Sequence, residues 1–128
     1  MSAEQAPAPR AAQLPEPPYY AVVFTSLRTD GDHGYGETAD RMEELVREQP
    51  GFLGVDSVRQ GDGLGITVAY FADEASVLAW RQNAEHAAAR AKGRSTWYDH
   101  YAVHVAKVER AYRSPVSTLP SVESTPER

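Results

Sequence analysis

The sequence contains no cysteine in its 128 residues, so disulfides, thiolate metal sites and a cysteine nucleophile are excluded. It also lacks a run of about 18 apolar residues, the length that a helix needs to cross a bilayer. The first residues lack the basic and apolar stretches of a secretory signal. We therefore expect a cytoplasmic protein with no membrane-embedded segment.

Basic residues are outnumbered by acidic ones. Lys and Arg total 13, Asp and Glu total 18, and the formal net charge is -5. A nucleic-acid-binding domain usually carries a basic patch, so we expect no nucleic-acid partner. The hydrophobic fraction of 41% suits a folded core, and the length suits a single domain.

Proline is scarce in the middle of the chain, where only Pro50 lies between residues 19 and 114. The flanks are rich in proline, alanine, serine and glutamate but poor in large apolar residues. Such segments cannot bury enough surface to offset the entropy of ordering. We predict a folded domain over residues 19–113, between disordered tails at residues 1–18 and 114–128.

The hydrophobic pattern of this central region predicts alternating strands and helices. Strands are expected at 19–28, 52–59, 64–71 and 97–110, and a helix at 36–49 that ends at Pro50-Gly51. A second helix begins after the cap Asp73, breaks near Asn83 and ends at Gly93. The order β-α-β-β-α-β predicts an α+β, ferredoxin-like fold.

Two helices on one sheet cover only one of its faces. The other face stays partly apolar, and folded proteins seldom leave such a patch exposed. We therefore expect a homodimer in which the uncovered sheet faces meet.

Trp80 and His86 are the main candidates for a functional site, and each has two interpretations. Trp80 is either a core residue or a wall that stacks on a planar substrate. His86 lies among alanines, and either faces solvent or borders a ligand. Its ordinary pKa near 6.5 suits a base that removes a phenolic proton, and a neutral imidazole is equally able to bind haem iron.

Other aromatic and histidine residues are weighed in the same way. Phe24, Tyr70 and Tyr101 are candidates for the walls of a substrate pocket. His100 and His104 are four residues apart on the last strand, on the face expected for Tyr98. No third ligand is evident near these two histidines, so we predict no metal site.

The chain resembles the antibiotic biosynthesis monooxygenase (ABM) family over about residues 19–112. The matching pieces are the strand 20–25, the segment Gln49-Pro50-Gly51-Phe52-Leu53-Gly54, the strand 65–70, the Trp80…His86 segment and the closing stretch from Trp97-Tyr98 to Arg110. The resemblance implies a dimeric α+β barrel. It also implies a pocket in each protomer, between helices and sheet, for a flat hydrophobic molecule.

The family includes cofactor-independent oxygenases, quinol oxygenases and haem-degrading enzymes. The resemblance implies a monooxygenase that oxidises a small aromatic or quinol-type compound with O2, without metal or flavin. The haem-degrading branch has an asparagine on the first strand, whereas Phe24-Thr25-Ser26-Leu27 contains none. Two alternatives stay open: a haem-binding or haem-degrading protein, with haem as cofactor, and a non-catalytic dimeric module that binds a ligand.

Overall fold

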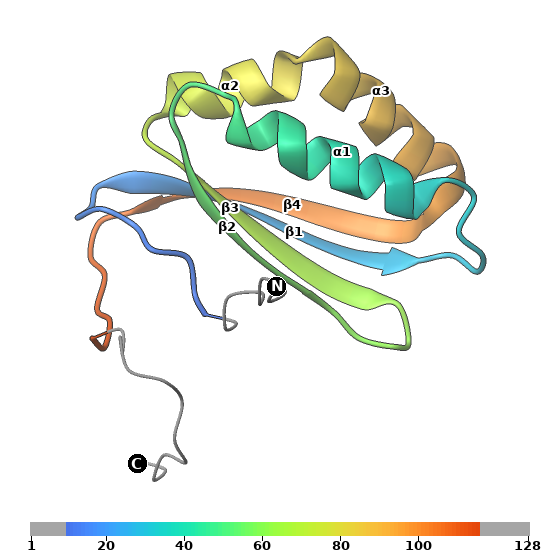
Figure 1. Cartoon of the computed structure of the whole chain (residues 1–128), viewed down its shortest axis with the longest axis horizontal. Coiled ribbons are helices and arrows are strands. Elements are labelled where there is room, and N and C mark those ends of the chain that lie inside the picture. Colours follow the sequence, from blue (N-terminus) through green and yellow to red (C-terminus); the bar gives the residue numbers. More distant parts are fainter. Residues whose placement is uncertain (1–9, 116–128) are drawn as a thin grey trace, which may run out of the picture.

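The computed structural model describes residues 10–115 as one antiparallel sheet with helices on one side (Figure 1). The strands are β1 (Tyr19–Arg28), β2 (Phe52–Arg59), β3 (Leu64–Phe71) and β4 (Tyr98–Val108), in the order β2-β3-β1-β4. The helices are α1 (Tyr35–Arg47), α2 (Glu74–Gln82), α3 (Ala84–Lys92) and the short π-helical η1 (Gly93–Trp97). The ferredoxin-like α+β prediction is confirmed.

Pro50 and Gly51 separate α1 from β2, as the sequence predicts. Gly51 adopts a φ of 84°, which is strained for any residue with a Cβ. A Cβ at this position would also clash with the Oγ of Ser76 on α2. The turn therefore serves two purposes, because it ends α1 and lets α2 approach the start of β2.

The helical segment after β3 is interrupted at Asn83, which confirms the predicted break. Asp73 caps α2 by accepting a hydrogen bond from the Ser76 backbone N–H at 2.8 Å. Asn83 leaves the helical conformation with a ψ of 128°. Its side chain caps α3 by accepting a hydrogen bond from the His86 backbone N–H at 3.0 Å. Gly93 does not end the helical path, however, because η1 continues it to the edge of β4.

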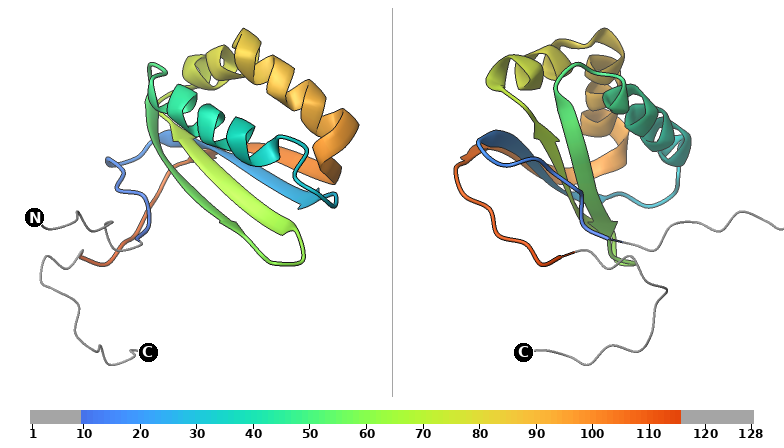
Figure 2. Two further views of the ribbon diagram at one scale, coloured as in Figure 1. Left: turned by 45° about the vertical axis from the view of Figure 1, so that its right-hand side comes forward. Right: turned by 60° about the vertical axis from the view of Figure 1, so that its left-hand side comes forward.

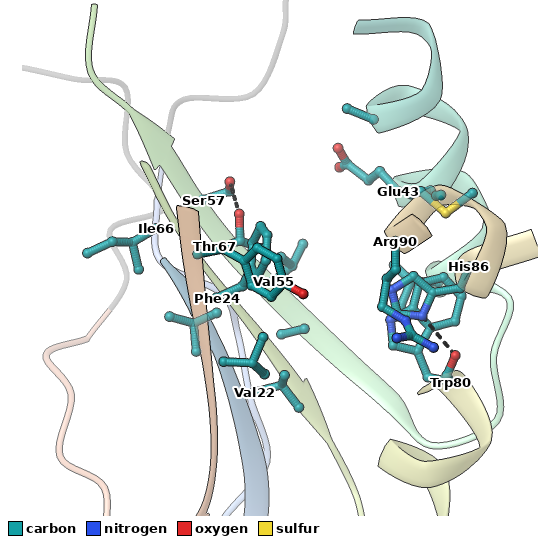
Figure 3. A pocket seen from close by; sticks show the side chains of 18 of the residues that line it. Val22, Phe24, Glu43, Val55, Ser57, Ile66, Thr67, Trp80, His86 and Arg90 are labelled. Atoms are coloured by element: carbon teal, nitrogen blue, oxygen red, sulfur yellow. Dashed lines mark hydrogen bonds between the residues drawn. The ribbon is translucent and has the colours of Figure 1, made fainter. Parts of the chain in front are cut away.

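Alternate residues of each strand face the helices. Phe24 pairs with Thr67 on β3 and Val103 on β4, and Val22 pairs with Ala69 and Val105. Figure 3 shows the Val22 and Phe24 side chains pointing toward the helical layer. Val103 and Val105 nevertheless keep 44% and 53% of their surface exposed. The helices therefore leave the helix-facing side of β4 open.

No helix within residues 10–115 lies over the opposite face of the sheet (Figure 2). Val58, Leu64 and Ile66 lie on this face and are 70%, 40% and 43% exposed. The start of the described chain covers one corner, where the Ala12 N–H donates to Asp56 at 2.8 Å and Leu14 lies beside Gly54.

The predicted tails fall mostly outside the described residues, since 1–9 and 116–128 are not part of them. Residues 10–18 do make contacts with the sheet, and Arg113 donates to the Leu14 carbonyl and pairs with Glu16 at 3.0 Å. The boundaries at 18 and 114 stay predictions. None of the described helices has the length and apolar character needed to cross a membrane.

Candidate functional site

A cavity of about 1190 Å³ lies between the helices and the sheet. Val22, Phe24 and Val55 form an apolar floor on the sheet, and Trp80 and His86 face them from the helical layer (Figure 3). Tyr101 lines the cavity toward the open edge at β4 and is 40% exposed. The space is large enough for a bicyclic or larger aromatic molecule.

Trp80 and His86 form a stack at this cavity. Their ring centroids are 4.0 Å apart and their planes differ by 12°. On a straight helix, residues six apart point in directions about 120° apart. The break at Asn83 changes the direction of the chain between the two residues, and this brings both rings to one place.

The His86 ring is held in one tautomer by the backbone. Its Nδ1 lies 2.9 Å from the Trp80 carbonyl oxygen, which can only accept, so Nδ1 carries the proton and donates. The Nε2 atom then keeps its lone pair. An imidazole oriented in this way is able to act as a base at Nε2.

Burial lowers the pKa of His86 below its ordinary value, and the positive charges of Arg90 and Arg81 lower it further. The hydrogen bond to the Trp80 carbonyl opposes these effects only in part. The ring is therefore neutral at pH 7, which is the protonation state that a general base requires.

A second cluster lies at one end of the cavity, where residues near the ends of β1 and β2 meet the first residues of α1 and β4. Arg59 donates to the Ser26 Oγ at 2.8 Å and to the Tyr35 hydroxyl at 3.4 Å, and the Tyr35 ring meets the Tyr98 ring edge-on at 5.9 Å. Burial, followed by the neighbouring Tyr35, raises the pKa of Tyr98. Tyr98 therefore stays protonated, and Tyr35, Arg59 and Tyr98 line this end of the cavity.

Comparison with known proteins identifies the family. Residues 18–92 match the model of the antibiotic biosynthesis monooxygenase (ABM) family. The chain belongs to the ABM family. A Bacillus subtilis relative named "Uncharacterized protein YqjZ" is 58% identical over 99 residues, which cover 77% of this chain and 87% of that protein.

Solved structures similar to this ABM domain show the same fold. SnoaB, a cofactor-independent oxygenase from Streptomyces nogalater, has a TM-score of 0.61 at 13% identity. The superposition covers 82% of this chain and 100% of the SnoaB chain. Protein SO0527 from Shewanella oneidensis has a TM-score of 0.65 at 10% identity, and the superposition covers 79% of this chain and 100% of the SO0527 chain.

The ABM domain brings together four of the five predicted site residues. Trp80, His86, Phe24 and Tyr101 line one cavity. Tyr70 does not line it, because its position on β3 faces the opposite side of the sheet. There Tyr70 contacts the Tyr19 ring at 5.8 Å and donates to Asp56 at 3.3 Å.

His100 and His104 lie away from the cavity. The register of β4 shifts between the partners of Leu27 and Arg28, so His100 does not share the face of Tyr98 as the sequence predicted. The described residues contain no group of three His, Asp or Glu side chains that could hold a metal ion.

Several cavity residues were not predicted from the sequence, namely Arg59, Tyr35 and Arg90. Arg90 follows His86 by four residues, so helical periodicity places it on the same side of α3. That spacing was the available signal for Arg90. Arg59 and Tyr35 come from separate elements, and no local pattern joins them.

Proposed function

We propose that the protein is an ABM-type monooxygenase that oxidises a small phenol or quinol with O2, using neither metal nor flavin. The observation that carries the proposal is the His86 imidazole opposite the apolar floor of the cavity, with Nδ1 bonded to the Trp80 carbonyl, Nε2 available as an acceptor and a pKa lowered by burial. Family membership supports the general class of reaction.

In the proposed reaction, His86 Nε2 accepts the phenolic proton of a bound substrate. The resulting phenolate is electron-rich and supplies the electrons that reduce O2. One oxygen atom forms a new bond to a ring carbon, and the other leaves as water. The O–O bond breaks, and a phenol with a free para carbon thus gives a quinone and water. The two protons of that water are the phenolic proton held by His86 and the proton that the para carbon loses when its carbonyl forms.

The Trp80–His86 stack and the sheet floor position the substrate. An aromatic ring above Val22 and Phe24 replaces water against apolar side chains, which strengthens polar interactions inside the cavity. Trp80 orients the imidazole through its carbonyl and its ring, so its role is positioning.

The test is O2 consumption with a panel of naphthols and hydroquinones, comparing His86→Ala with His33→Asn. His33 is an exposed histidine in the loop before α1 that does not line this cavity, and Asn tolerates its positive φ, so H33N is the control. A base of this kind contributes roughly 100- to 10,000-fold in rate, and H86A should lose a factor in that range while staying folded. Equal turnover by both variants would contradict the proposal.

Haem binding is a second candidate for the same side chain. An imidazole whose Nδ1–H is bonded to a carbonyl is the usual form of a metal-ligating histidine, and His86 has this arrangement. His86 would therefore hold the haem iron through Nε2, and bound haem would supply redox chemistry. Titration with hemin separates the candidates, because a Soret shift that is lost in H86A but kept in H33N favours haem.

We also propose a homodimer formed through the uncovered sheet face. Val58, Leu64 and Ile66 supply the exposed apolar surface. Sedimentation at micromolar concentration should give twice the chain mass, and Ile66→Glu should give a monomer. A wild-type monomer under these conditions contradicts the dimer.

A further inference from the structure

The charge around the cavity is opposite to that of the chain. The chain carries a net charge of -5. The charged residues that line the cavity, however, are mostly basic: two acids, Glu43 and Asp56, against Arg10, Arg47, Arg59, Arg81, Arg90 and Arg94. Glu43 is already paired with Arg47 at 2.8 Å. The rest of this lining is therefore strongly positive.

Arg90 is the central member of this group. One of its terminal nitrogens donates to the Arg81 carbonyl at 3.0 Å, while its Nε–H is buried without a partner. No ion pair involving Arg90 occurs among residues 10–115. Burial and the charges of Arg81 and Arg94 lower the pKa of Arg90. An unpaired, half-buried guanidinium is costly, and an anion in the cavity would offset that cost.

The position of Arg90 relates this charge to the proposed base. It lies one helical turn after His86 and on the same side of α3, and both residues line the cavity (Figure 3). Tyr101 on β4 lies close enough to influence the pKa of Arg90. A planar ligand whose hydroxyl reaches His86 Nε2 would thus hold its neighbouring substituent near Arg90.

We propose that the cavity selects aromatic compounds that carry a carboxylate next to the reacting hydroxyl, with Arg90 binding the carboxylate. This proposal rests on the proposed function for the role of His86 and adds the substrate class. The apolar floor of Val22, Phe24 and Val55 contacts the ring, Arg90 supplies a charge-assisted hydrogen bond, and Arg94 and Arg81 add to the local positive potential.

The experiment compares an ortho-hydroxynaphthoic acid with its carboxamide by isothermal titration calorimetry. The two probes share ring and hydroxyl, and the carboxamide replaces the anionic carboxylate with a neutral group of similar size. The acid should bind the wild type about tenfold or more tightly, the usual gain for a hydrogen bond to a charged group. The preference should shrink as salt is raised from 0.05 to about 0.5 M, since salt screens the potential from the exposed arginines.

Three variants assign the preference to Arg90. In Arg90→Gln the two probes should bind equally, with the carboxamide affinity unchanged. In Arg90→Lys part of the preference should return, because the charge is kept. The control Arg110→Gln, an exposed arginine beyond the end of β4, should behave as the wild type. A merely structural role for Arg90 would weaken both probes equally in R90Q.

The remaining outcomes also decide the proposal. Equal binding of acid and amide by the wild type, or an unchanged preference in R90Q, overturns it. Binding of hemin but not of the naphthoic acid, with the same dependence on Arg90, assigns the carboxylate to haem propionates. Binding of none of these probes overturns it too. Acid binding that depends on Arg90 without O2 consumption keeps the ligand class and removes the monooxygenase.

Discussion

The cap of α3 offers a sharp test of how the fold holds the proposed base. The Asn83 side chain accepts the backbone N–H of His86 at 3.0 Å, and the His86 ring in turn donates to the Trp80 carbonyl. Asn83→Ala removes the first of these interactions. Because Ala cannot accept that N–H, the first turn of α3 should fray and the imidazole should lose its fixed orientation.

The size of the effect follows from the cap. Loss of an N-cap asparagine lowers the free energy of unfolding by about 1 kcal/mol, which lowers Tm by roughly 4–8 °C in a domain of this size. If the destabilisation is confined to the first turn of α3, ligand binding must re-form that turn. The affinity then falls by up to about fivefold, the factor that corresponds to that free energy.

The assay combines thermal unfolding, calorimetry with an aromatic ligand and an NMR titration of His86. Asp73→Ala is the matched control, because Asp73 caps α2 with the same geometry and does not line the cavity. D73A should lower Tm without changing ligand affinity. Asn83→Ser, which keeps a capping oxygen on α3, should retain both the Tm and the ligand affinity of the wild type. A folded N83A protein with unchanged affinity and an unchanged His86 pKa would refute the reasoning.

Three further predictions follow from the same structure. Because burial lowers the pKa of His86, the imidazole stays neutral at pH values somewhat below its ordinary pKa near 6.5, and turnover should fall only below pH 6.5. The stability that the neutral, buried ring contributes should be present above pH 6.5 and lost as the pH falls through the lowered pKa. A pH–rate profile and unfolding curves at several pH values will test both. Gly51→Ala should destabilise more than Gly34→Ala in denaturant titrations, because both positions have a φ near +85° but only Gly51 also faces a clash, with Ser76; equal losses would mean that α2 moves freely. Trp80→Ala should cost less than the roughly 3 kcal/mol lost with a fully buried tryptophan, because Trp80 is only half-buried; a larger loss would place Trp80 in the core.

Local sequence patterns predicted the elements of the fold well, for a physical reason in each case. The aromatic and β-branched run at 19–28 coincides with β1, since such residues favour a pleated, packed strand. Pro50-Gly51 ends α1, because proline lacks the N–H that a helix needs and Gly51 accepts a positive φ. Asp73 caps α2 through a contact only three residues long, so sequence alone predicted this cap. At Asn83 the sequence predicted the break, and the structure added that the Asn83 side chain caps α3.

The faces of the strands, by contrast, were decided by tertiary structure. Alternation along a strand says which residues share a face but not which face the helices cover. Phe24 and Tyr70 were equivalent candidates by sequence, yet only Phe24 lies under the helices. The strand pairing places Phe24 with Thr67 and Val103 on the helix-facing side of the sheet, and Tyr70 on the other side. The register shift in β4 likewise separates His100 from Tyr98, and nothing in the local pattern marks it.

The chemistry of the site divides along the same line. The sequence alone determined that a tryptophan, a histidine and a helix break occur within seven residues, and this predicted their meeting at one pocket. The tautomer of His86 depends on the Trp80 carbonyl, which is near in sequence but meets the ring only because of the angle between α2 and α3. The burial that lowers the His86 pKa and leaves the Arg90 Nε–H without a partner arose only when these helices packed over the sheet.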